Sequence, residues 1–240
     1  MPNWVFNTMK FYEGYEDFKK KYVEIVSDDK GNKKEVFDYN KVIQRPKSLE
    51  LTDGTITAHS VVYYLTDRLT KYYINEQDMP IYQRATYSNI TQLGEWISRV
   101  KSALEDKNFN YTADKLYELG EIYVNNFRQY GALTWYDWSN RNWGVKWNAY
   151  DTVFDDKNST VHFDSPWTYP YPVLDKLAEE NKSYNVDVYS EEETGWWVSQ
   201  RIMDGKHYDP VDDGELEWDD ENDTYKESTG EECLIFTNKN

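Results

Sequence analysis

The chain of 240 residues carries 27 Lys and Arg against 44 Asp and Glu, a formal net charge of -17 at pH 7. Aromatic residues make up 17% of it, which is unlike the composition of a disordered chain. A single cysteine, Cys233, excludes an internal disulfide and a multi-cysteine zinc site, and no stretch approaches the roughly 20 apolar residues that span a bilayer. We therefore expect a folded cytoplasmic protein without membrane contact, in which aromatic clusters supply much of the core.

The excess negative charge is confined to one part of the chain. Residues 1–150 contain 20 acidic and 20 basic residues, whereas residues 151–240 contain 24 acidic and 7 basic residues. An acidic surface repels the phosphates of nucleic acid. The charge distribution therefore predicts a basic protein as partner and no direct binding to nucleic acid.

The first elements follow from apolar periodicity. Residues 3–11 alternate in the manner of a half-buried strand. From Tyr15 apolar residues recur at helical spacing as far as Ile25, which predicts a helix that ends before the polar loop at 27–32. Residues 58–73 show an ambiguous pattern that a helix would satisfy.

Two clearer helices follow. The apolar face of the first consists of Leu93, Trp96, Ile97, Val100 and Leu104. Thr112 suits the N-cap of the second helix, and Gly131 follows its end. The pair predicts a helical hairpin inserted at about 85–131.

The remaining pattern is one of short strands, at 160–163, 184–189 and 195–203, with a short helix that begins near Pro172. An order of strand, helix, strands, helix and strands favours an α+β domain over residues 1–205. Its natural form is a split β-α-β antiparallel sheet with helices on one face. Residues 206–240 are expected to form an acidic C-terminal extension that packs on the sheet or continues it.

An aromatic block occupies residues 130–147, where four tryptophans fall close together. One interpretation is a structural aromatic core, and the other is a ring-lined pocket that holds Asp137 and Lys146. Both interpretations involve Trp135, Asp137, Trp138, Trp143, Lys146, Trp147 and Trp167.

The same block carries a resemblance to a known family. The segments concerned are Met1–Trp4 with Asn7, residues 37–51 with Pro46, residues 135–147, and residues 163–167. In these segments the chain resembles the Api92-like proteins of phages and plasmids, which contain a YubB-type ferredoxin-like domain. The resemblance implies a ferredoxin-like α+β fold and an origin in a mobile element acting in a host cell, and it carries no established activity.

Known catalytic and metal-binding motifs are not apparent. His59, His162 and His207 lack the spacing that brings two imidazoles to one metal, and acidic neighbours disfavour the reactive thiolate of Cys233. A calcium-loop pattern that begins at Asp209 has Val211 where a ligand is needed. The sequence therefore predicts no metal, no cofactor and no catalytic residue.

The leading hypothesis concerns the acids of the final segment. In residues 214–219 acids alternate with Leu216 and Trp218, so an extended chain would place the carboxylates on one face, spaced similarly to phosphates. Turns bearing further acids would extend this surface. The expected partner-binding residues are Glu191, Glu192, Glu193, Asp212, Asp213, Glu215, Glu217, Trp218, Asp219, Asp220 and Glu221.

Such a surface would let a non-enzymatic protein imitate nucleic acid and block the basic channel of a host defence nuclease, as in anti-CRISPR or anti-restriction inhibition. The plain alternative is that the acids only maintain solubility. A second alternative is a metal-assisted hydrolase or nucleotide-modifying enzyme that uses Asp137, Lys146 and His162. A third is a structural or replication accessory protein of the mobile element.

Overall fold

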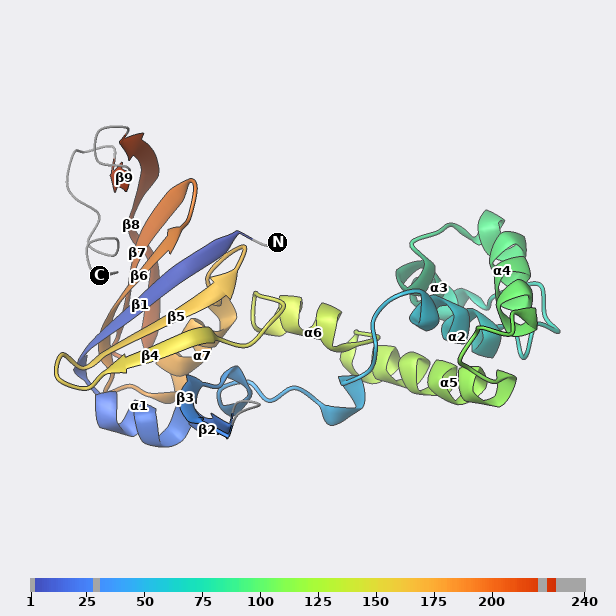
Figure 1. The fold of residues 1–240 in the computed structure, drawn as a ribbon, viewed down its shortest axis with the longest axis horizontal. Coiled ribbons are helices and arrows are strands. Elements are labelled where there is room, and N and C mark those ends of the chain that lie inside the picture. Colours follow the sequence, from blue (N-terminus) through green and yellow to red (C-terminus); the bar gives the residue numbers. More distant parts are fainter. Residues whose placement is uncertain (1–2, 28–30, 220–223, 228–240) are drawn as a thin grey trace. The chain divides into compact units, whose positions relative to one another are not determined.

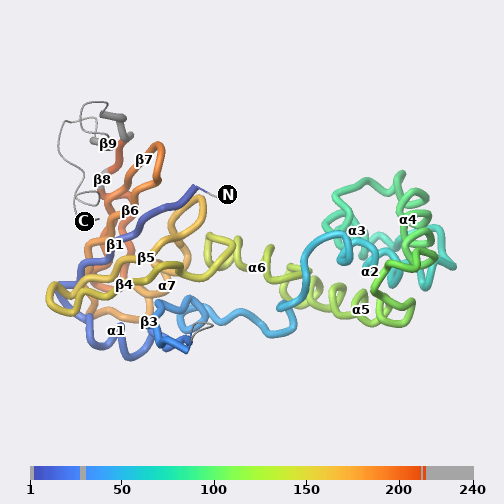
Figure 2. Tube along the Cα trace, in the orientation of Figure 1, coloured from blue at the N-terminus to red at the C-terminus, as the bar shows by residue number. Residues whose placement is uncertain are grey.

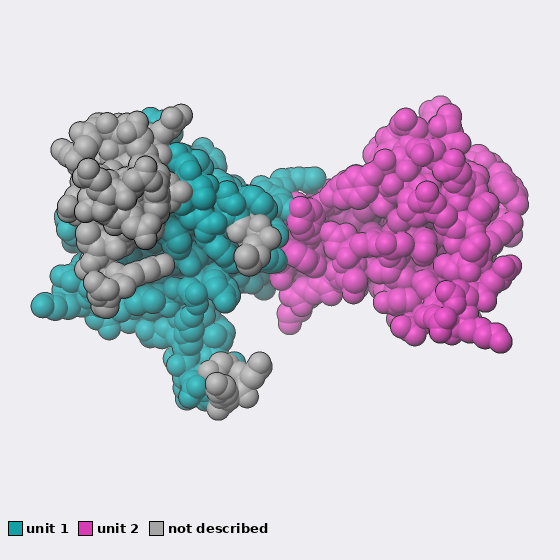
Figure 3. All heavy atoms as spheres, turned by 45° about the horizontal axis from the view of Figure 1, so that its top comes forward, with its two compact units in different colours: residues 1–44, 139–240 teal, residues 45–138 magenta. Residues whose placement is uncertain are grey.

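The computed structural model (Figures 1 and 2) describes residues 3–27, 31–219 and 224–227, and only the backbone of 212, 215–219 and 224–227. The chain divides into two compact units, which Figure 3 distinguishes by colour. The sheet unit consists of residues 1–44 and 139–240, and the helical unit of residues 45–138. The helical unit is therefore an insertion between two parts of the sheet unit.

The sheet unit is built on a seven-stranded sheet in the order β4-β5-β1-β6-β7-β8-β9, in which all neighbouring strands are antiparallel. The strand bounds are β1 Trp4–Glu13, β4 Tyr150–Asp155, β5 Thr160–Pro166, β6 Asn185–Glu192, β7 Trp196–Met203, β8 Lys206–Asp219 and β9 Thr224–Glu227. Strand β1 lies between two strands from the far end of the sequence, as the blue ribbon in Figure 1 shows. The sheet therefore forms only when both parts of the sheet unit are present.

Further elements accompany this sheet. They are helices α1 Tyr15–Tyr22 and α7 Tyr171–Glu180, the 3-10 helix η1 Tyr39–Lys41, and a separate hairpin of β2 Val23–Ser27 and β3 Lys33–Phe37. Pro172 stands in the first turn of α7, where its missing N–H costs nothing. Helix α7 packs against β7 and β8.

The core of the sheet unit contains a row of aromatic rings. Phe18 of α1 has its ring centroid 4.9 Å from that of Phe11 and 5.0 Å from that of Phe37. Phe37 in turn lies 5.3 Å from Phe163, and Tyr39 lies 5.7 Å from Trp143. All of these rings are buried. Tilted and edge-on contacts of this kind stabilise beyond the area that they bury, so aromatic rings here take the place of aliphatic core residues.

A chain of buried polar side chains crosses the same sheet. The Asn7 amide donates to Ser165 Oγ at 2.8 Å and to two backbone carbonyls, while Ser190 Oγ donates to Asn7 Oδ1 at 2.8 Å. Gln200 Nε2 donates to Ser190 Oγ at 3.2 Å, which leaves Gln200 Oε1 3.0 Å from His207 Nε2.

His207 Nδ1 lies 2.9 Å from the carboxylate of Asp175 on α7. Both ring nitrogens of His207 therefore lie within hydrogen-bond distance of a side-chain oxygen. Because each polar group in this chain has a partner, the strands β5, β1, β6, β7 and β8 are held in one register.

The helical unit has its own core. Its elements are η2 Lys47–Leu49, α2 Thr55–Leu65, η3 Glu76–Asp78, α3 Met79–Thr86, η4 Ile90–Gln92, α4 Leu93–Glu105 and α5 Ala113–Tyr130, and α6 Trp135–Asn142 begins in this unit. Helix α2 supplies Val62 and Tyr63 to one apolar cluster and Val61 to a second. It is therefore apolar on several faces and lies at the centre of the unit, which explains its ambiguous periodicity.

Several sequence-based expectations are confirmed. Thr112 caps α5 by accepting a hydrogen bond from the Lys115 backbone at 3.2 Å, and Gly131 ends it in the left-handed conformation. The strands at 3–11, 160–163, 184–189 and 195–203 and the helix at Pro172 are present, and the chain is a mixed α+β protein with an antiparallel sheet. No helix within the described residues is long and apolar enough to cross a membrane.

Two boundaries differ from expectation. The first helix ends at Tyr22 rather than continuing to Ile25, because residues 23–27 pair with 33–37 as a hairpin and leave Ile25 exposed. The inserted unit spans 45–138 rather than about 85–131, because α2 and α3 pack with α4 and α5 and share their core.

Helices α2 and α5 approach closely at Gly120. A Cβ atom placed on Gly120 would lie 2.2 Å from the backbone oxygen of Ser60 and 2.6 Å from Tyr64 Cβ. Backbone atoms cannot move aside as a flexible side chain would. Gly120 is therefore required by packing.

We expect Gly120→Ala to lower the free energy of unfolding by about 2–3 kcal/mol because it forces the two helices apart. Gly94→Ala in α4 is the matched control, since a Cβ there meets nothing within 4 Å. The control should raise stability by about 0.5–1 kcal/mol through helix propensity. Urea unfolding of both variants measures the difference, and equal effects would contradict the close contact of α2 and α5.

Candidate functional site

The helical unit contains a cavity of about 640 Å³. Its walls come from the start of α2, the end of α3, Trp96 of α4, and the start of α6. The lining residues are Asp53, Gly54, Thr55, Thr57, Ala58, Arg84, Ala85, Thr86, Tyr87, Trp96, Leu133, Trp135, Tyr136 and Asp137. A volume of this size is typical of small-molecule sites, so we take the cavity as the candidate site.

An ion pair forms one wall. Arg84 Nε donates to Asp137 Oδ2 at 2.7 Å, and Arg84 Nη2 bonds to Asp137 Oδ1, so that the pair is bidentate. The side chain of Asp137 is only 10% exposed. The hydrogen bonds to Asp137 raise the pKa of Arg84 and keep it charged. The charges of Arg84 and Asp137 therefore neutralise each other.

Asp53 lines the cavity directly before Gly54, which precedes the first residue of α2. Loss of solvent against the cavity walls raises the pKa of the Asp53 carboxyl, and the nearby charge of Asp137 raises it further. The Thr134 hydroxyl, Arg84 and the Gly54 backbone act in the opposite direction without cancelling the rise. The ionised form of Asp53 is therefore less favourable in the folded chain than in water.

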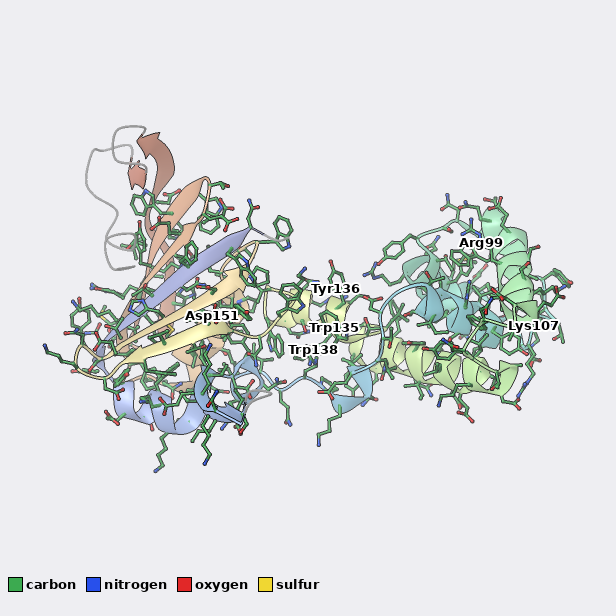
Figure 4. All side chains as sticks on the ribbon, viewed as in Figure 1. Arg99, Lys107, Trp135, Tyr136, Trp138 and Asp151 are labelled. Atoms are coloured by element: carbon green, nitrogen blue, oxygen red, sulfur yellow. The ribbon has the colours of Figure 1, made fainter. Side chains whose placement is uncertain are left out.

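Aromatic residues also line the cavity, and we call this set the aromatic rim: Tyr87, Trp96, Trp135 and Tyr136. Trp135 and Tyr136, which Figure 4 labels at the start of α6, have centroids 5.7 Å apart in an edge-on contact. The Arg84 guanidinium lies 4.7 Å from the Tyr87 ring centroid. Arg99, also labelled, lies 4.8 Å from the Trp96 ring centroid. Tyr87 and Trp96 thus each make a cation–π contact with a guanidinium group of the chain itself.

Comparisons with known proteins give one weak link. No protein-family model matches the chain, and no curated protein does. Among solved structures, the chain is similar to protein Api92 from Yersinia pseudotuberculosis, described under the family model DUF1281. The identity is 10%, with 90% of this chain and 98% of that chain covered, and the TM-score is 0.38.

The aromatic block is divided between a pocket and a core. Trp135 and Asp137 line the cavity of the helical unit. Trp143, in contrast, is buried in the sheet unit, where its indole N–H donates to the Ile43 carbonyl at 2.9 Å. Trp138 is buried as well. The block therefore contributes residues both to a core and to the lining of a cavity, but this cavity holds Asp137 without Lys146.

The other residues of the aromatic set lie on the sheet unit. The ammonium of Lys146 is 3.8 Å from the Trp147 ring centroid, and Trp147 is 40% exposed. Trp167 is 56% exposed beyond the end of β5. These three residues belong to the surface of the sheet unit rather than to the cavity.

The expected acidic surface is corrected at two positions. Glu191 and Glu192 lie within β6 rather than in a turn, and they are 0% and 5% exposed. Glu191 is buried because its register in the sheet places it between Phe6 of β1 and Trp197 of β7. Glu192 accepts hydrogen bonds from Thr194, whose backbone N–H lies 3.0 Å away.

The remaining expected acids fall into three groups. Glu193 is partly exposed and Asp213 is exposed on β8. The backbone of Asp212, Glu215, Glu217, Trp218 and Asp219 belongs to β8, but their side chains are outside the described part of the chain. Asp220 and Glu221 lie outside the described residues altogether.

The residues proposed for an enzyme do not share a pocket within either unit. Asp137 is paired with Arg84 in the helical unit, whereas Lys146 and His162 belong to the sheet unit, with His162 Nδ1 2.9 Å from Thr8 Oγ1. Within the described residues no three His, Cys, Asp or Glu side chains are grouped as metal ligands. Asp209 and Val211 lie on strand β8, so they do not form the calcium loop that their pattern suggests.

Sequence reasoning missed Asp53, Arg84, Tyr87 and Trp96 as pocket residues. They are separated by up to 43 positions, so no local spacing links them to each other or to Trp135. The sequence contained one local signal: Asp and Gly, which stand at positions 53 and 54, are residue types preferred just before a helix.

Because the pKa of Asp53 is raised in the folded chain, ionised Asp53 lowers stability, and this loss appears as pH rises through that pKa. We expect Asp53→Asn, which resembles the protonated form, to increase the free energy of unfolding at pH 7. The gain should vanish below the unfolded-state pKa of about 3.9. Urea unfolding at neutral and acid pH measures this, with the exposed Glu105→Gln as control. An equal gain at both pH values, or a loss at pH 7, would contradict the assignment.

Proposed function

We propose that the chain is a non-enzymatic binding protein whose sheet unit holds a basic macromolecular partner through an acidic surface. The observation that carries the proposal is the division of charge between the units. Residues 45–138 contain 12 acidic and 10 basic residues, whereas the rest of the chain contains 32 acidic and 17 basic residues. The sheet unit therefore has a net charge of -15 and the helical unit only -2.

Internal ion pairs leave much of this charge uncompensated. Residues 151–240 contain 24 acids and 7 Lys and Arg. Lys176 is already engaged by Glu179 and Glu180, at 3.2 and 3.4 Å, and Arg201 by Asp187 at 2.7 Å. Because few Lys and Arg side chains of this segment remain to neutralise its acids, a basic partner would supply the missing positive charge.

Strand β8 supports the proposed location of the surface. It is an extended strand from Lys206 to Asp219, paired with β7 as far as Glu215. An extended backbone is what the proposed alternation of acids over 213–219 requires. We propose that the acids at these positions of β8 carry the carboxylate row.

The proposed partner is a basic host protein that binds nucleic acid, in particular a defence nuclease whose channel the carboxylate row would occupy in place of DNA or RNA. This makes the chain a nucleic-acid mimic that acts in the cytoplasm. The support is electrostatic: an ordered acidic strand competes for the cationic groups that otherwise contact phosphates.

We also infer that the core of the sheet unit is a ferredoxin-like split β-α-β. Strands β1, β4, β5 and β6, with helices α1 and α7 between them, support this inference. Their spatial order is β4-β5-β1-β6, antiparallel throughout. In this arrangement the first strand stands between the two strands that flank the second helix.

The proposal predicts salt-sensitive binding that depends on four acids. Proteins captured from host lysate at about 50 mM salt should be released at about 500 mM, where the Debye length is only a few ångströms. The captured protein should be a basic one that duplex DNA displaces. Glu215→Gln, Glu217→Gln, Asp219→Asn and Asp220→Asn together should weaken its binding at least about tenfold.

A variant with the same charge change in the helical unit is the control. Glu76→Gln, Glu95→Gln, Glu105→Gln and Glu121→Gln replace four exposed acids there and should leave binding within about twofold. Equal losses of affinity in the two variants would mean that binding depends only on the overall charge of the chain. Unchanged binding in the first variant, or a partner that DNA does not displace, would refute the mimic.

A further inference from the structure

The lining of the cavity keeps one carboxylate after its own ion pair is formed. Its charged lining residues are Asp53, Arg84 and Asp137. Both carboxylate oxygens of Asp137 bind one edge of the Arg84 guanidinium, so the charge of Arg84 is already matched. Asp53 is the remaining charged residue of the lining, and the Arg99 guanidinium lies beside the lining ring of Trp96. The lining therefore offers the carboxylate of Asp53 to a ligand.

An anion does not fit this arrangement. The amino-terminal end of α2 lies on the cavity wall and carries a partial positive charge, but Asp53 already supplies a carboxylate next to it. A second anion would be repelled by Asp53. Lost solvent, and after it the charge of Asp137, raises the pKa of Asp53, so a bound cation would favour the ionised form of this carboxyl.

The aromatic rim suits a flat cation. Two rings of the rim already carry guanidinium groups of the chain, Arg84 at Tyr87 and Arg99 at Trp96. Trp135 and Tyr136 add ring surface from α6 to the same cavity. A guanidinium combines stacking on a ring with two parallel N–H bonds to a carboxylate, whereas a compact ammonium stacks less well.

We propose that this cavity binds the guanidinium group of a small molecule or of an exposed arginine side chain, with Asp53 as its carboxylate partner and Trp135 and Tyr136 as walls. The volume of about 640 Å³ exceeds that of a bare guanidinium, so the ligand carries a further apolar or polar stem. This site lies in the helical unit and is independent of the acidic surface proposed for the sheet unit. Either proposal can fail without the other.

Matched ligands test the site in the full chain by calorimetry and tryptophan fluorescence. N-acetylarginine methylamide is expected to bind, and N-acetylcitrulline methylamide, which has the same shape without the charge, should bind at least tenfold more weakly. Agmatine serves as the free small-molecule form. Tighter binding of agmatine would indicate a free metabolite as the ligand, and tighter binding of the arginine derivative would indicate a polypeptide side chain.

Variants locate the binding. Asp53→Asn should weaken binding of the arginine derivative at least tenfold, and Trp135→Leu should weaken it severalfold, while Glu105→Gln outside the cavity should have no effect. Circular dichroism checks that each variant remains folded. Equal affinity for the citrulline derivative, unchanged binding in Asp53→Asn, or no binding of either cation up to about 10 mM would overturn the proposal.

Discussion

The hydrogen bond from the Trp143 indole to the Ile43 carbonyl is the contact on which the architecture depends. It joins, at 2.9 Å within the sheet unit, the segment before the insertion and the segment after it. Trp143 is buried, and its ring packs on Tyr39. Closing a loop of this length costs conformational entropy, which a large buried ring with a satisfied N–H can offset. Residues 45–138 can therefore be a separate unit without opening the sheet.

The same division explains the unusual composition. Large rings supply much of the buried area in both units. In the sheet unit they form the row from Phe11 to Trp143. Rings that are not used in the cores, such as Trp135 and Trp147, lie at the cavity and on the surface. The aromatic residues thus build both cores and also supply rings to the cavity and to the surface.

Elements with strong local signals were predictable from the sequence. Helix α5 has both a capping threonine and a terminal glycine, and β1 alternates cleanly. Strand β2 was missed because a short apolar run fits the period of a helix as well as that of a strand. Only its pairing with β3 shows that it is a strand. The burial of Glu191 was missed for a related reason: three consecutive glutamates suggest a turn, and only their place in the centre of the sheet shows otherwise.

The site was less predictable than the fold, because Asp53, Arg84 and Asp137 meet only through tertiary packing. The most direct test of the architecture replaces residues 45–138 with a short glycine-serine linker. We expect the remaining chain to unfold cooperatively, with Trp143 still shielded from quenchers and the amides of β1, β5 and β6 still protected from exchange. A remainder without exchange protection would contradict a sheet unit that closes on itself through Trp143.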